Sequence, residues 1–160
     1  MRSKILLACL FAVAGSTLQT AHAEEGATLF LQNCAACHGA DALGVEGLAP
    51  PLKNESLWRR LGDSASAYIA GIVTGGMSGQ LNVGDQEYRD LVMPPQTHLP
   101  SEQLATIASY VLQKINGHPV SVSAEQIEAG KIEPPAHKAL QALRQKAEDE
   151  NRTTLAQARN

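Results

Sequence analysis

Hydrophobic positions recur at a helical spacing in several segments of the chain, and no segment shows the alternation typical of a strand. The clearest pattern covers residues 101–116, where the apolar positions three or four residues apart are Leu104, Ile107, Ala108, Val111 and Leu112. Ser101 is predicted to cap this helix and Gly117 to end it. These features predict one long helix in the second half of the chain.

Weaker helical patterns cover residues 24–36, 56–61 and 64–73, with Ser64 as a candidate N-cap of the third. Ser123 and Gln126 have the spacing of a capping box. Residues 136–151 could form a charged helix, whose thin apolar stripe consists of Leu140, Leu143 and Ala147.

Residues 39–56 and 75–100 are rich in glycine and proline and are predicted to be loops, with at most one helical turn near residues 85–90. The sequence therefore predicts an all-α protein.

The first 23 residues have the pattern of a signal peptide. Arg2 and Lys4 precede an apolar run from Ile5 to Gly15, and Ala21-His22-Ala23 then resembles a signal-peptidase site. The apolar run is shorter than the roughly 20 residues that a membrane-spanning helix needs, and no later segment is more apolar. We therefore expect cleavage before Glu24, a periplasmic location and no stable membrane span.

Composition and charge exclude one class of function and bear on how the core is filled. The chain has 160 residues, enough for one domain with an extension, and its net charge is −3 without a clustered basic face. We therefore expect no nucleic-acid partner. Aromatic residues make up only 4% of the chain. Such a chain can still be compact if a large apolar cofactor fills its centre.

Cys34, Cys37 and His38 form a Cys-Ala-Ala-Cys-His motif. A thioredoxin-like redox pair would begin a helix after a strand, whereas these cysteines come at the end of a predicted helix, with no strand pattern before them. A zinc site would usually include a second close pair of ligands, and residues 39–160 offer only scattered histidines. The spacing is that of a c-type haem attachment motif, in which the sulfurs form thioethers and the histidine binds iron. We therefore expect one covalently bound haem c.

The histidine supplies one axial iron ligand, so a second must come from elsewhere. Met93 fits best, because two prolines follow it that stiffen the chain and donate no backbone hydrogen bonds. A lone methionine is ordinarily core filler, but beyond a haem motif a Met-Pro-Pro sequence favours a thioether ligand. Met77 leaves less chain to cross the haem, and His98 is the nitrogen alternative. The predicted axial ligands are thus His38 and Met93.

Residues 25–117 resemble a class I cytochrome c. The motifs that carry the resemblance follow the order of that family: Gly26 with Phe30, Cys34 to Gly39, Pro50-Pro51-Leu52, Met93-Pro94, and a last helix with Ile107 and Tyr110. The resemblance implies a cytochrome c fold, with three to five helices around one haem, over residues 24–117. It leaves residues 118–160 as a C-terminal extension, helical or disordered.

The same resemblance implies roles for further residues. Gly26 and Phe30 would meet Ile107 and Tyr110 where the first and last helices cross. The carbonyl of Pro50 would accept a hydrogen bond from the haem-ligating histidine. Leu52 would pack on the haem face. Trp58 would line the pocket.

Contacts to the haem propionates are a further expectation from the sequence. The indole N–H of Trp58 is a candidate donor to a propionate, and Arg59 or Arg60 could pair with one. Solvated arginines beside a packed tryptophan are the alternative.

A six-coordinate iron with histidine and methionine ligands has no position for a substrate, and this indicates outer-sphere transfer of one electron. The resemblance extends to cytochromes that serve periplasmic dehydrogenases, oxidases and nitrite reductases, so the expected partners are a periplasmic dehydrogenase or reductase and a terminal oxidase. Two alternatives stay open. The chain could be a dedicated cytochrome subunit of a dehydrogenase or reductase complex, held by residues 131–160, or a haem enzyme or gas sensor with an open iron position.

Overall fold

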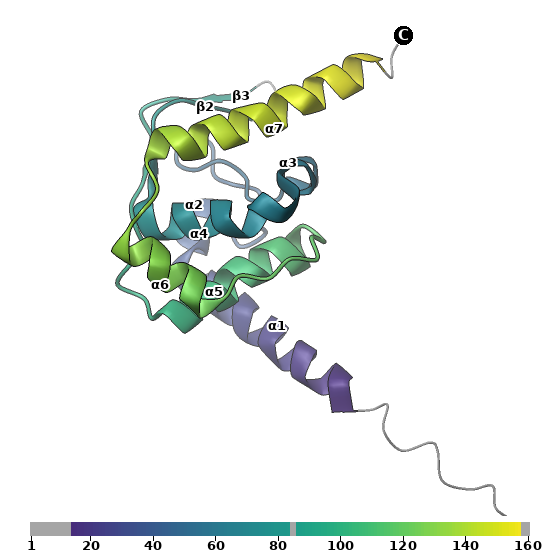
Figure 1. Ribbon diagram of the computed structural model, residues 1–160, viewed down its shortest axis with the longest axis vertical. Coiled ribbons are helices and arrows are strands. Elements are labelled where there is room, and N and C mark those ends of the chain that lie inside the picture. The colour runs from purple at the N-terminus through teal and green to yellow at the C-terminus, as the bar shows by residue number, and fades with distance from the viewer. Residues whose placement is uncertain (1–13, 84–85, 158–160) are drawn as a thin grey trace, which may run out of the picture.

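The computed structural model describes residues 14–83 and 86–157, with the side chains of residues 23–83 and 86–150. Helices dominate this part of the chain, which confirms the predicted all-α class (Figure 1). The elements are α1 (Ala14–Asn33), α2 (Ala35–His38), α3 (Glu55–Leu61), a 3-10 turn η1 (Gly62–Ser64), α4 (Ala65–Gly75), β1 (Met77–Ser78), β2 (Leu81–Val83), β3 (Gln86–Tyr88), β4 (Val92–Met93), α5 (Ser101–Tyr110), a π-helix η2 (Val111–Ile115), α6 (Ala124–Ile132) and α7 (His137–Gln157).

The predicted signal peptide is described only in part. Its charged start and residues 5–13 of the apolar run lie outside the described residues. α1 begins at Ala14 and runs without a break past the predicted cleavage point between Ala23 and Glu24. The signal peptide therefore stays a prediction.

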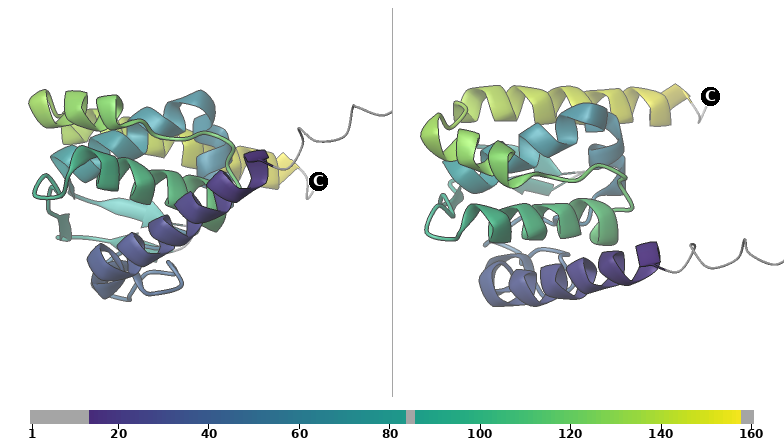
Figure 2. Two further views of the ribbon diagram at one scale, coloured as in Figure 1. Left: turned by 90° about the horizontal axis from the view of Figure 1, so that it is seen from below. Right: turned by 60° about the horizontal axis from the view of Figure 1, so that its bottom comes forward.

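α1 crosses α5 on one side of the molecule (Figures 1 and 2). Gly26 permits the close approach, because a β-carbon at this position would lie 2.7 Å from Cβ of Tyr110. One turn later, the ring of buried Phe30 lies 5.9 Å, centroid to centroid, from the ring of Tyr110. The predicted contact of Gly26 and Phe30 with Tyr110 is thus confirmed.

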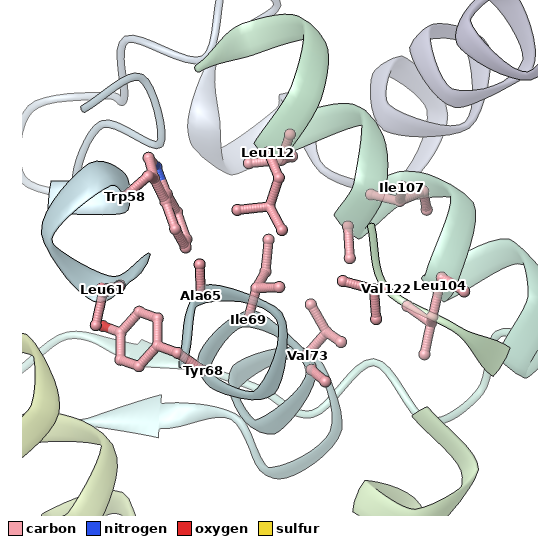
Figure 3. Packing of buried hydrophobic residues seen from close by; sticks show 14 of the residues in the cluster. Trp58, Leu61, Ala65, Tyr68, Ile69, Val73, Leu104, Ile107, Leu112 and Val122 are labelled. Atoms are coloured by element: carbon pink, nitrogen blue, oxygen red, sulfur yellow. The ribbon is translucent and has the colours of Figure 1, made fainter. Parts of the chain in front are cut away.

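The core lies between α3, α4 and α5. Figure 3 shows Ile69 of α4 directed toward Leu112, and Val73 directed toward Val122. The ring of Tyr68 lies on the side of α4 near Leu61. Trp58 packs edge to face on Tyr68, with ring centroids 5.9 Å apart. Such aromatic pairs stabilise a core beyond the area that they bury.

α3 begins one residue earlier than predicted. Its N-cap is Asn54, whose side-chain oxygen accepts a hydrogen bond from the Leu57 amide at 3.1 Å. Ser64 precedes α4 but makes no side-chain capping bond. The two predicted helices are therefore present.

The long helix of residues 101–116 is also present and ends at Gly117 as predicted, but its N-cap differs from the prediction. Pro100 occupies the N-cap position, and the Ser101 hydroxyl bonds Glu128 of α6 instead of capping α5. The last turn widens into the π-helix η2, and Asn116 then bonds across to the loop before α3. Gly117 ends the helix with a positive φ of 63°.

Residues 77–93 contain short strands, where the sequence predicted loop and at most one helical turn. β1 pairs antiparallel with β4, and β2 with β3. The expected turn near residues 85–90 is wrong for the residues described there, because Gln86–Tyr88 is a strand. Strands of two or three residues are too short to show a period of two, which is why the pattern missed them.

The C-terminal extension packs on the rest of the fold. α6 lies beside α4 and α5, and α7 crosses α3 and α4 on the side opposite α1 (Figures 1 and 2). The predicted capping box of Ser123 and Gln126 is present in full. In the predicted apolar stripe of α7, Leu140 and Ala147 are buried, whereas Leu143 is 40% exposed.

Two histidines of the C-terminal part of the chain are held by the fold. His118 is buried after η2. His137 is half-buried at the start of α7, where Nε2 lies 2.9 Å from the Gly75 carbonyl and Nδ1 lies 2.8 Å from the Ser78 hydroxyl. These bonds fix the start of α7 against the end of α4.

Candidate functional site

A single helical turn places Cys34, Cys37 and His38 together. α1 ends at Asn33, Cys34 is the N-cap of α2, and His38 is its last residue. The His38 amide donates to the Cys34 carbonyl at 3.0 Å. Residues three and four apart share a helix face, so the motif presents both sulfurs and the imidazole on one side. Both cysteines are free thiols, and burial raises the pKa of Cys34 to about 11.

The imidazole of His38 is fixed by the backbone of the proline segment. Its Nδ1 lies 3.1 Å from the Pro50 carbonyl oxygen. A carbonyl only accepts, so Nδ1 carries the hydrogen, and in the neutral ring the Nε2 lone pair is free to bind a metal. Burial lowers the pKa of His38, and the bond to Pro50 partly opposes this. The arrangement favours a neutral ligand held in one orientation.

The predicted site residues converge on one cavity of about 330 Å³. Cys34, Cys37, His38, Pro50, Leu52, Trp58 and Met93 all line it. Most of its remaining walls are apolar side chains. The lining residues that the sequence did not single out include Leu48, Leu57, Tyr68, Ile72, Leu81, Val92 and Arg144.

Met93 lies on β4, and its register partner across the short β1–β4 pair is Met77. Both thioethers line the cavity, Met77 being buried and Met93 half-buried. Gly76 permits the pairing, because its φ is 76° and a β-carbon there would lie 2.5 Å from the Met93 carbonyl oxygen. His98, the nitrogen alternative, is exposed and does not line the cavity.

Trp58 lines the cavity but does not have the role expected for its N–H. The indole Nε1 donates to the Leu52 carbonyl at 2.9 Å. An indole has one donor, so the predicted bond to a propionate is wrong for this structure. Arg59 is exposed, and neither Arg59 nor Arg60 lines the cavity.

Sequence reasoning missed Arg144, the arginine that does line the cavity. It lies on α7, between Leu140 and Ala147 on the same buried face. A signal was present, because Arg144 follows Leu140 by four residues and precedes Ala147 by three. The apolar stripe of α7 therefore contains a cation, and Leu143 lies outside it.

The residues that line the cavity suit a haem better than a bare metal ion. Among the described residues, no group of three or more histidine, cysteine, aspartate or glutamate side chains is placed to hold a metal ion. The cavity instead offers one oriented imidazole, thioethers, two thiols and a large apolar surface. A planar apolar macrocycle that brings its own iron fits this donor set.

A family model described as cytochrome c matches residues 23–114, more than half of the chain. The chain belongs to the cytochrome c family. Haem c, covalently attached and containing iron, is therefore its cofactor. The match ends before α6 and α7, so the extension lies beyond the part that the family model covers.

Parts of the chain are similar to two other proteins. The Cbb3-type cytochrome c oxidase subunit CcoP of Cereibacter sphaeroides is 39% identical over 54 residues, which are 34% of this chain and 19% of that protein. Cytochrome c-552 of Thermus thermophilus is 26% identical over 87 residues, which are 54% of this chain and 65% of that protein. The chain thus matches less than two thirds of either relative. None of the helices described here is long and apolar enough to cross a membrane.

Proposed function

We propose that this cytochrome c transfers single electrons in the periplasm, with haem c attached to Cys34 and Cys37 and ligated by His38 and Met93. The supporting observation is that these four side chains line one cavity, in which the Pro50 carbonyl orients the imidazole. When bound, the haem supplies a one-electron couple between Fe(III) and Fe(II).

The protein residues keep the ligand geometry constant between the two oxidation states. The bond to Pro50 gives the His38 ring one orientation. The β1–β4 pairing holds the backbone of Met93. A thioether is a soft ligand that favours Fe(II). An apolar pocket also favours Fe(II), because the extra positive charge of Fe(III) is poorly solvated inside it. We therefore expect a higher potential than that of a site with two histidines.

An electron partner would dock where the cavity opens. Leu48 and Val92 both line the cavity and are 49% and 70% exposed. Cys37, a proposed attachment site, is also exposed. Apolar side chains at the mouth of the cavity would suit a transient partner that excludes water during transfer.

The ligand assignment is tested by a matched pair of variants, Met93→Leu and Met77→Leu. Both remove a thioether from the same cavity and keep a similar volume. We expect the sulfur-to-iron charge-transfer band of the oxidised protein to disappear in Met93→Leu and to persist in Met77→Leu. Loss of the band only in Met77→Leu would assign the ligand to Met77. A five-coordinate, high-spin wild-type iron would instead favour a haem enzyme or gas sensor.

Export is tested by cell fractionation and N-terminal sequencing of the haem-loaded protein. We expect a periplasmic protein that begins at Glu24. Replacing Arg2 and Lys4 by glutamate should strongly reduce export, because the positive n-region is lost. A haem-loaded product that still begins at Met1 would refute the cleavage.

A dedicated role as a complex subunit is the second candidate, and the similarity to the oxidase subunit CcoP favours it. One face of α7 packs on the chain itself, so a partner would bind the outer face, where Lys138 and Lys146 are exposed. Reversing both charges should weaken co-purification with a periplasmic redox complex and leave the haem spectrum unchanged. Unaltered complex formation would exclude this surface.

A further inference from the structure

The arginine in the cavity wall is buried to an extent unusual for a cation. Arg144 is 8% exposed, and α7 packs its face on α3 and α4. Arginine is almost never buried without a partner, because a desolvated charge is unfavourable. The partners of Arg144 therefore decide what this side chain does.

Those partners use only part of the guanidinium group. Its Nε lies 2.9 Å from Oε1 of Glu148, one turn later on α7, which makes an ion pair but not a hydrogen bond of acceptable geometry. Its Nη2 atom is also buried, yet it makes no hydrogen bond of acceptable geometry to any described residue. The hydroxyl of Tyr68 on α4 is buried and lacks such a bond as well. Unsatisfied buried donors are rare in folded proteins and call for an explanation.

The two unsatisfied groups lie beside each other at one cavity wall. Burial raises the pKa of Tyr68, and the positive charge of Arg144 and its polar contact with the Tyr68 hydroxyl oppose this rise. Both residues line the cavity that also contains His38 and Met93. The phenol oxygen can accept from a guanidinium N–H, but the phenol O–H then still lacks an acceptor. The ligand atom that completes the pair is therefore an acceptor, and the buried positive charge makes an anion the best match.

We propose that Arg144 and Tyr68 bind a haem propionate, so that α7 of the extension completes the cofactor pocket. The inference rests on the proposed haem attachment. A propionate is a carboxylate, whose planar group fits the arginine fork and accepts from a hydroxyl at the same time. Arg144 and Tyr68 thus take the role that the sequence suggested for Trp58, Arg59 and Arg60.

Other ionisable groups surround Arg144 and enter any pH measurement. Glu148 lies on its own helix, and Tyr68 faces it from α4. His38 lines the same cavity from α2. Arg60 of α3, the helix packed against α7, is half-buried and has an interaction of its own. The experiment therefore needs a signal that belongs to the propionate alone.

The test uses the haem-loaded protein with ¹³C-labelled haem carboxylates. Its potential is measured by spectroelectrochemistry between pH 5 and 9, together with isotope-edited infrared difference spectra. In the wild type, we expect a nearly constant potential and only ionised propionate bands. In Arg144→Gln, we expect a pH-dependent potential and a labelled carboxylic-acid band, because the propionate loses its counter-charge and its pKa rises.

Three further variants separate this role from a structural one. Arg144→Lys keeps the charge and should retain the wild-type profile, which also covers the case in which Arg144→Gln does not fold. Lys146→Gln removes a charge from the exposed face of α7 and should change neither signal. Glu148→Gln breaks the ion pair and should show no carboxylic-acid band. Such a band in Glu148→Gln equal to that in Arg144→Gln would overturn the proposal.

The failure of this inference can be told from failure of the proposed function. An Arg144→Gln protein with covalent haem, an intact sulfur-to-iron band and the wild-type pH profile refutes only the propionate contact. A wild-type protein without covalent haem refutes the proposed function itself.

Discussion

The packing of α7 on α4 can be tested by truncating one leucine. Leu140 is 2% exposed, and its Cδ2 lies 3.0 Å from the point where a β-carbon on Gly71 would lie. The glycine therefore makes room for the leucine, and little space is left between the helices. Leu140→Ala removes the side chain that fills this contact.

The expected loss of stability combines two effects. Transferring a buried leucine side chain to water contributes about 1.5–3 kcal/mol. The cavity left behind adds to this when the surroundings relax only in part, and buried Leu→Ala changes typically cost about 2–5 kcal/mol. The backbones of α4 and α7 cannot simply close the gap, because His137 also fixes the start of α7. We therefore expect a loss of about 3 kcal/mol for Leu140→Ala.

Leu143→Ala is the matched control, because it makes the same chemical change on the same helix. Leu143 is 40% exposed, so we expect a loss of about 1 kcal/mol or less. Unfolding of the haem-loaded proteins in guanidinium chloride, followed by circular dichroism and haem absorbance, gives both values. Equal, small losses for the two variants would refute the packing of α7 on α4 and, with it, the position of Arg144 in the pocket.

Two further predictions concern polar groups that fix the helix ends. Asn116→Ala should cost at least about 2 kcal/mol, because it leaves the Asn54 amide and the Val111 carbonyl without the bonds of 2.7 and 2.8 Å that Asn116 provides; a loss under about 0.5 kcal/mol in denaturant unfolding would contradict this. Ser123→Ala should cost about 1 kcal/mol, because it removes the capping box of α6. Exposed Ser121 lies outside that helix, so Ser121→Ala should have almost no effect, and equal losses would argue against the cap.

The sequence predicted those parts of the site that depend on local spacing. The Cys34–His38 motif lies on one helical turn, and the loop to Pro50 is short, so the chain itself brings these groups together. The helices after residue 55 were also predicted, because their apolar positions repeat over several turns. Boundaries were less certain: Pro100, and not Ser101, occupies the N-cap position of α5.

Contacts between distant segments could not be predicted in this way. The pairing of Met77 with Met93 joins two strands of two residues each, and no periodic pattern marks such short elements. Trp58 lines the cavity, but its N–H partner is the Leu52 carbonyl, a backbone group that composition does not reveal. A donor's partner depends on tertiary geometry and not on residue type.

Arg144 shows how a local signal gains meaning only from packing. An arginine within an apolar helix stripe has two explanations: either the stripe faces solvent, or the interior that it faces contains an anion. Leu140 and Ala147, on either side of Arg144 along the stripe, are both buried, which excludes the first. Glu148 supplies one anion, but Nη2 remains without an acceptor. If the haem occupies this cavity as proposed, it would bring carboxylates to Arg144. The stripe of α7 would then be a wall of the cofactor pocket, and only its outer face would remain for a partner.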